Sequence, residues 1–158
     1  MITVISYAAS YRNQPIELFG GDTPELLELA VQKTMNANSQ TWVLDVVLHA
    51  MESETYTTAL LQMDDLLEDF ESILSHSPWL AGETYSLADV AYTSYLTRLE
   101  LLQFHGMWQD RPNLAAYYAR LKARPSYTEV IDNYREDFLE VLSTEETFCY
   151  QLPSSHGI

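Results

Sequence analysis

The sequence WLAGETYSLADVAY, residues 79–92, contains the pattern that marks the start of a buried helix. Ser86 is a residue type favoured at a helix N-cap, and Asp89 follows three positions later, as a capping box requires. In that arrangement the Ser86 hydroxyl accepts the amide of Asp89, and the Asp89 carboxylate accepts the amide of Ser86. Tyr85 before the cap and Val90 after it can close over the box as a hydrophobic staple. The pattern predicts a structural role, not a catalytic one, for Ser86 and Asp89.

Apolar residues recur every three or four positions on both sides of this stretch, as in helices that bury one face. We expect helices over residues 53–76, 87–102, 112–124 and 125–135, and one long or kinked helix over residues 24–51. Residues 1–8 alternate weakly between apolar and polar side chains, which favours a short strand. The predicted fold is an all-α bundle of five to six helices. The chain then divides into an N-terminal arm of strand and loop (1–23), a helical domain (24–135) and an acidic C-terminal helix or tail (136–158).

The chain carries a formal net charge of −15, and its charges are unevenly spread. Residues 1–97 contain two bases and fourteen acids, residues 98–135 six bases and four acids, and residues 136–158 five acids and no base. An acidic surface repels phosphates, so we expect no nucleic-acid partner. No apolar run reaches the roughly 18 residues of a membrane span, and one cysteine forms no intrachain disulfide. We therefore expect a cytoplasmic protein that does not bind membranes.

Side chains suited to catalysis are few and scattered. Residues 64–71 carry five acids on one face of an expected helix, which is typical of a solvated face. The four histidines fall at separate places, and the sequence contains neither a G-x-S-x-G elbow nor an H-E-x-x-H motif. We interpret Cys149 as a buried, inert thiol. The sequence therefore predicts no catalytic residue and no metal site.

Two segments resemble the C-terminal all-helical domain of glutathione transferases. Residues 77–102, SPWLAGETYSLADVAYTSYLTRLELL, resemble the turn and core helix of that domain. Residues 111–131, RPNLAAYYARLKARPSYTEVI, resemble its next two helices, and the order and spacing of the two segments also match. The residues around Trp108 and Arg111-Pro112 most resemble those of bacterial-type and reductive-dehalogenase-like members. The resemblance implies the same all-helical fold for residues 24–135.

In this family, hydrophobic substrates bind against the inner faces of two helices, which correspond here to residues 24–51 and 87–102. The resemblance implies that a pocket for a small hydrophobic ligand is lined by Met35, Asn38, Ser39, Trp42, Tyr95 and Arg98. The apolar members of this set are alternatively plain core residues. Arg98 is a base on an apolar stripe, so it either binds an acidic ligand or pairs with Glu100 or Asp45.

Family enzymes bind glutathione chiefly through an N-terminal thioredoxin-like domain, and residues 1–23 are too few to form one. At most, MITVISYAAS (1–10) resembles the first strand of that domain, which would place Tyr7 or Ser10 where a thiolate-stabilising hydroxyl belongs. We therefore expect no cofactor on this chain alone, and glutathione only when a thioredoxin-like domain is paired with it.

The resemblance implies one of two functions. The first is the hydrophobic-substrate-binding half of a glutathione-dependent transferase. The alternative is a non-catalytic protein-interaction module of the same fold, as in translation or synthetase assemblies. Without the thioredoxin-like half, an apolar face stays uncovered, which predicts a homodimer or a protein partner.

Overall fold

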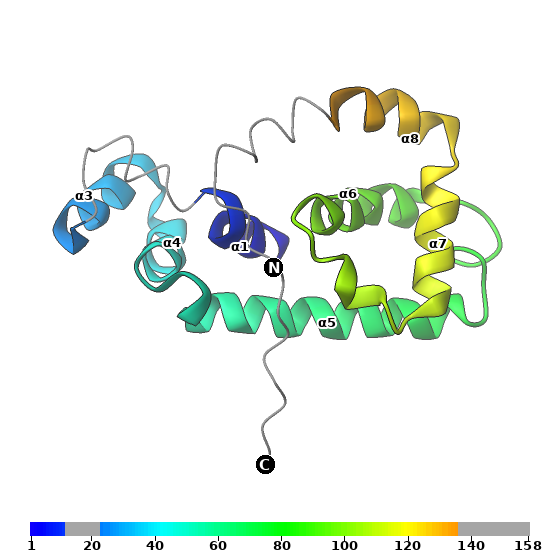
Figure 1. Cartoon of the computed structure of the whole chain (residues 1–158), viewed down its shortest axis with the longest axis horizontal. Coiled ribbons are helices and arrows are strands. Elements are labelled where there is room, and N and C mark those ends of the chain that lie inside the picture. The colour runs from blue at the N-terminus through cyan, green and yellow to red at the C-terminus, as the bar shows by residue number, and fades with distance from the viewer. Residues whose placement is uncertain (12–22, 136–158) are drawn as a thin grey trace, which may run out of the picture.

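The computed structural model describes residues 1–11 and 23–135, apart from the side chains of Ser10, Tyr11 and Thr34 (Figure 1). This part of the chain forms seven α-helices and no named strand, which confirms the predicted all-α fold. The helices are α1 (Ile2–Ser6), α3 (Pro24–Thr34), α4 (Ala37–His49), α5 (Glu54–Leu74), α6 (Leu87–Leu101), α7 (Pro112–Lys122) and α8 (Pro125–Val130). The acidic helix or tail predicted over residues 136–158 lies outside the described residues.

The N-terminal segment forms α1 and a π-helical turn, Tyr7–Tyr11, so the strand predicted over residues 1–8 is wrong. A lone strand would leave its backbone groups unpaired, whereas a helix pairs them internally, as the Ile5 amide does with the Met1 carbonyl at 3.1 Å. Ile5 and Ala8 are buried, so the apolar residues that favoured a strand form one helical face packed into the body. Because this segment is helical, the predicted resemblance of residues 1–10 to the first strand of a thioredoxin-like domain is also wrong.

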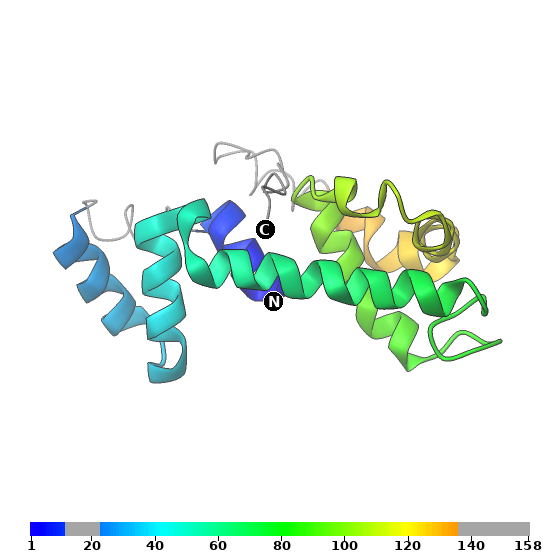
Figure 2. The ribbon, with the colours of Figure 1, turned by 90° about the horizontal axis from the view of Figure 1, so that it is seen from below.

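Residues 24–51, predicted as one long or kinked helix, form two helices, α3 and α4, with a break between them. Met35 and Asn36 have extended backbones, and the Asn36 side chain accepts the Ser39 amide at 3.1 Å. This side chain satisfies an amide that would otherwise lack a partner at the start of α4, so a second helix begins there. The two helices pack against each other and lie side by side at one end of the molecule (Figure 2).

α5 is the longest described helix and runs along most of the body (Figure 2). Its predicted apolar stripe is buried in the core and consists of Tyr56, Leu60, Met63, Leu67, Phe70 and Leu74. α1, α4 and α7 all contact this helix. α5 is therefore the element on which α1, α4 and α7 are assembled.

Part of the acidic face of α5, predicted to be only solvated, binds the segment that leads into α7. Arg111 donates to Asp64 Oδ1 at 2.8 Å and to Glu68 Oε2 at 3.1 Å. Glu71 accepts two backbone amides in the first turn of α7, at 3.2 and 2.8 Å. Because the first amides of a helix have no partner within it, Glu71 on α5 supplies the cap of α7.

The start of α6 is built around the carboxylate of Asp89, which is fully buried. A capping box is present at Ser86 and Asp89, in which Asp89 Oδ2 accepts the Ser86 amide at 2.7 Å and the Ser86 hydroxyl at 2.8 Å. Asp89 Oδ1 accepts the Leu80 amide at 3.0 Å and the Tyr117 hydroxyl at 2.9 Å. Burial alone would raise the pKa of Asp89, but the hydrogen bonds outweigh burial and lower that pKa. The carboxylate thus joins the preceding loop, α6 and α7.

The loop before α6 packs differently from the predicted hydrophobic staple. Val90 is 51% exposed, and Tyr85 lies edge-on to Trp79 with the ring centroids 5.2 Å apart. The Arg124 guanidinium lies 3.5 Å from the Tyr85 ring centroid, in the range of a cation–π contact. The loop turns at Gly82, whose φ of 112° is a conformation that few residues other than glycine adopt.

We expect Asp89→Asn to lower the free energy of unfolding by about 2–4 kcal/mol, because an amide cannot accept from all four donors. Ser86→Ala removes a single donor and should cost about 1 kcal/mol. Since the pKa of Asp89 is lowered on folding, its contribution is present above about pH 4 and is lost as the pH falls through the folded pKa. Urea unfolding at neutral and acidic pH measures both effects. Equal stabilities of Asp89→Asn and wild type at neutral pH would show that the Asp89 carboxylate does not hold the start of α6 in place.

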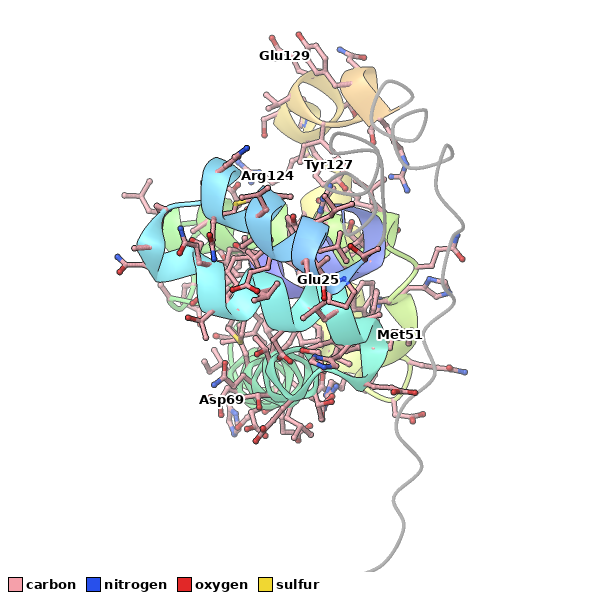
Figure 3. The ribbon with its side chains drawn as sticks, turned by 90° about the vertical axis from the view of Figure 1, so that its left-hand side faces the viewer. Glu25, Met51, Asp69, Arg124, Tyr127 and Glu129 are labelled. Atoms are coloured by element: carbon pink, nitrogen blue, oxygen red, sulfur yellow. The ribbon has the colours of Figure 1, made fainter. Side chains whose placement is uncertain are left out.

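We expect Glu71→Ala to lower the free energy of unfolding by about 1–2 kcal/mol, because the first turn of α7 loses its cap. Asp69→Ala is the matched control: Asp69 lies on the same helix, is exposed and points away from the body (Figure 3). The control should change stability by less than about 0.5 kcal/mol. Thermal unfolding of both variants tests the difference, and similar losses in the two would refute the capping role.

Candidate functional site

The residues predicted to line a ligand pocket lie on or next to α4 and on α6, and α1 lies between these helices (Figure 1). α1 contacts α4, α5 and α6. The N-terminal arm therefore occupies the middle of the face on which one continuous pocket was expected. Two separate cavities result, one between α1 and α6 and one between α1, α4 and α5.

The first of these, called here the Arg98 cavity, has a volume of about 450 Å³. Its lining comes from α1, from the turn after it and from α6, and consists of Ile2, Thr3, Ser6, Tyr7, Ser94, Tyr95 and Arg98. Arg98 Nε donates to the Ser6 hydroxyl oxygen at 2.9 Å, which directs the guanidinium towards α1. Glu100, one of the two carboxylates considered as partners for Arg98, binds Lys122 and Arg135 at 2.8 and 3.0 Å. The cavity thus combines one cation with aromatic rings and hydroxyl groups.

The second space, called here the Trp42 groove, has a volume of about 640 Å³. Asn38 and Trp42 line it together with side chains from α1 and α5. The Trp42 ring meets the Tyr7 ring edge-on, with the ring centroids 5.7 Å apart. Because Tyr7 lines the Arg98 cavity and Trp42 lines the groove, this ring pair separates the two spaces. Burial raises the pKa of Tyr7, so its hydroxyl stays protonated at neutral pH.

The remaining predicted pocket residues, Met35 and Ser39, line neither of these two spaces. Met35 is half-buried and packs against the core, and Ser39 is half-buried in the first turn of α4. The structure therefore brings Tyr95 together with Arg98, and Asn38 together with Trp42, without joining the two pairs. A substrate-binding role for these residues stays a prediction.

Asp45 is a site residue that sequence reasoning considered only as a partner of Arg98. Its carboxylate accepts the Ser53 hydroxyl at 2.6 Å, the Thr55 amide at 3.2 Å and His49 Nδ1 at 2.9 Å. These hydrogen bonds, with Ser53 the largest contributor, lower the pKa of Asp45 to about 2. Asp45 lines both the Trp42 groove and a third cavity of about 410 Å³ between α3 and α4. Ser53 before a strongly periodic helix signals an N-cap, but no local pattern points to Asp45.

The described residues show no arrangement of side chains that could bind a metal. In residues 1–11 and 23–135, no group of three histidine, cysteine, aspartate or glutamate side chains is placed to hold an ion. Across the same ranges, no helix has both the length and the hydrophobicity that crossing a membrane requires. Cys149 lies outside the described residues.

The long α5, the capped start of α6 and the docking of α7 on both define an all-helical domain with a ligand-sized cavity beside α6. Residues 53–120 match the family model described as glutathione S-transferase, C-terminal domain. Residues 53–120 are therefore similar to the C-terminal domain of glutathione S-transferases, which confirms the predicted resemblance.

Curated relatives match the same kind of domain. Tetrachloro-p-hydroquinone reductive dehalogenase of Sphingobium chlorophenolicum is 35% identical over 88 residues, covering 54% of this chain and 36% of the relative. Glutathione S-transferase TCHQD of Arabidopsis thaliana is 35% identical over 86 residues, covering 54% and 32%. A 2,5-dichlorohydroquinone reductive dechlorinase of Sphingobium indicum is 37% identical over 79 residues, covering 47% and 23%. The matches thus span about a third of the relatives' length or less. No solved structure is significantly similar to the chain.

We expect Asp45→Asn to lower the free energy of unfolding by about 1–2 kcal/mol at neutral pH. The folded pKa of about 2 lies below that of an unfolded aspartate, so the contribution of Asp45 is present above about pH 4 and disappears as the pH falls towards 2. Urea unfolding over this pH range should show the gap to wild type narrowing on acidification. Asp65→Asn, at an exposed position of α5, is the control. A gap that stays constant with pH would show that the carboxylate charge is not the cause.

Proposed function

We propose that this chain provides the substrate-binding half of a glutathione-dependent transferase, acting beside a thioredoxin-like half that holds glutathione. The observation that carries the proposal is the Arg98 cavity, which lies on α6, a helix within the matched range 53–120. Its volume of about 450 Å³ is in the range of small-molecule pockets, which start near 300 Å³. A ligand there would lie between α1 and α6 and contact the rings of Tyr7 and Tyr95.

In this proposal, the residues of this chain bind and orient the substrate, and the thiol is activated elsewhere. The lining of the Arg98 cavity includes no carboxylate, histidine or cysteine that could accept a proton from a thiol. The Tyr7 hydroxyl is protonated at neutral pH, so it can donate a hydrogen bond but cannot act as a base. Holding a substrate in line with a thiolate is itself a large source of rate acceleration, since it replaces an encounter in solution. The other half would supply the thiolate.

The names of the relatives suggest the substrate class. Two of them are named for reductive removal of chlorine from hydroquinones, and a third is named as a glutathione S-transferase. We extend this chemistry to the present chain as a substituted aromatic substrate. Aromatic side chains in the lining suit such a ring, because aromatic pairs gain about 0.5–1.5 kcal/mol beyond simple burial.

A non-catalytic interaction module of the same fold is the second candidate, and the position of α1 favours it. α1 packs between α4 and α6, and it covers part of the face that the resemblance leaves for a thioredoxin-like half. At the start of α6, Leu87 is 85% exposed and Val90 is 51% exposed, which suits contact with a protein partner or a second copy. Either function suits the cytoplasm, where a chain with one cysteine needs no disulfide.

We expect the purified chain alone to show no glutathione-dependent turnover of an activated aromatic halide, because the described residues hold no thiolate site. Turnover should appear when a thioredoxin-like protein from the same cell is added, and it should fall when Tyr95 is replaced by alanine. A spectrophotometric conjugation assay measures both. Turnover by the repurified chain alone would refute the division into two halves. No turnover with any thioredoxin-like partner would favour the interaction module.

A further inference from the structure

Two arginines, one near the end of α7 and one just after it, lie over aromatic rings of the loop before α6. The guanidinium carbon of Arg120 is 5.7 Å from the Trp79 ring centroid, and that of Arg124 is 5.8 Å from the same centroid. Arg124 also lies 3.5 Å from the Tyr85 ring centroid. Both side chains are directed at one ring, so two positive charges are held near each other. These four residues are called here the arginine corner.

Neither guanidinium of the arginine corner is neutralised by a carboxylate. The ion pairs within residues 1–11 and 23–135 involve other bases, and neither Arg120 nor Arg124 takes part in one. Asp89, the carboxylate buried at the start of α6, is satisfied by backbone amides and hydroxyl groups instead. Two neighbouring cations repel each other, and an anion placed beside both relieves that repulsion.

The two guanidiniums also keep N–H donors without an acceptor. Both Nε atoms are buried and have no hydrogen-bond partner in the described residues. Arg120 Nη2 donates to the Pro78 carbonyl oxygen at 2.7 Å, whereas the Arg124 guanidinium contacts aromatic rings. Both residues are only half-buried, so the Nη ends reach the surface. A guanidinium stacked on a ring has a fixed plane, and its edge matches a carboxylate through two parallel hydrogen bonds.

The charge of the whole chain limits which anion can approach the arginine corner. The formal net charge is −15, so nucleic acid or an anionic membrane would bring many like charges close to an acidic surface. A ligand with few carboxylates on a neutral or apolar body avoids most of this repulsion. Leu87, two residues after Tyr85, is 85% exposed and offers apolar surface whose burial favours binding of such a body.

We propose that the arginine corner binds an acidic segment of a protein partner, with a carboxylate on the Arg124 guanidinium and an apolar side chain against Leu87. Arg120 raises the positive potential at the same place while it stays bound to the Pro78 carbonyl oxygen. The inference goes beyond the proposed transferase, because none of these residues lines the Arg98 cavity. It names the kind of partner that an interaction module of this fold would take.

Two short capped peptides that differ only in charge test the inference. Both contain alanine and leucine, and one adds a pair of glutamates where the other has a pair of glutamines. We expect the full chain to bind the glutamate peptide about tenfold more tightly at low ionic strength, the size of one hydrogen bond to a charged group. High salt should reduce this preference, because it screens exposed ion pairs. NMR titration of the isotope-labelled chain measures both affinities and should shift the Nε–H signals of Arg120 and Arg124.

Variants locate the effect. Arg124→Gln should abolish the preference for the glutamate peptide, and Arg120→Gln should weaken it. Leu87→Ser should weaken binding of both peptides and leave their ratio unchanged. Lys33→Gln removes the same charge from an exposed position on α3 and should change neither affinity. Thermal unfolding shows whether each variant is folded, and the Nε–H shifts of the wild-type chain keep the test valid if Arg124→Gln is not.

Equal affinities of the wild-type chain for the two peptides, or no binding of either, would overturn the inference. So would a preference that survives Arg124→Gln or falls equally in Lys33→Gln. Tighter binding of inorganic phosphate than of the glutamate peptide would also overturn it, because the site would then select a phosphate group. The titrations contain neither glutathione nor a thioredoxin-like protein, so their failure is distinct from failure of the proposed transferase.

Discussion

The buried carboxylate of Asp89 is the constraint on which the helix arrangement depends. A buried charge costs several kcal/mol unless it is fully hydrogen-bonded, and Asp89 is 0% exposed. Its donors come from the loop at Leu80, from Ser86 at the start of α6 and from Tyr117 on α7. None of these elements can move without leaving the charge unsatisfied, so the loop and both helices are fixed together. Arg98 also lies on α6, so its position beside α1 depends on how the loop, α6 and α7 are held together at Asp89.

The parts of the fold that depend on local sequence patterns could be predicted. The buried stripe of α5 follows a 3.6-residue period, and the box at Ser86 and Asp89 needs only four consecutive residues. The contacts that hold the helices together are not local. Arg111 binds Asp64 from 47 positions away, and no period or motif relates two such residues. For the same reason the sequence predicts that the acidic face of α5 is only solvated, although Arg111 and the first turn of α7 bind part of it.

The candidate site was harder to predict because its two spaces are formed by α1, α4, α5 and α6, and the sequence does not show how these helices are arranged in space. A short apolar run such as residues 1–8 suits a strand or a helix equally, and only its surroundings decide between them. Once it is helical, α1 enters the face between α4 and α6, and the Tyr7–Trp42 ring contact divides one expected pocket into two. Tyr95 and Arg98 share a helix and stay together. Met35 lies apart from the other predicted pocket residues because a new helix, capped by Asn36, begins after it.

Most of the bases of this acidic chain lie in residues 98–135, where they serve the packing of the helices. Among the six bases of residues 98–135, Arg111 binds carboxylates of α5, and Lys122 and Arg135 bind Glu100. Arg120 and Arg124 stack on the aromatic rings of the corner before α6. Those five charges are used to hold the bundle together, and Arg98 likewise ties α6 to α1, because its Nε donates to the Ser6 hydroxyl oxygen at 2.9 Å.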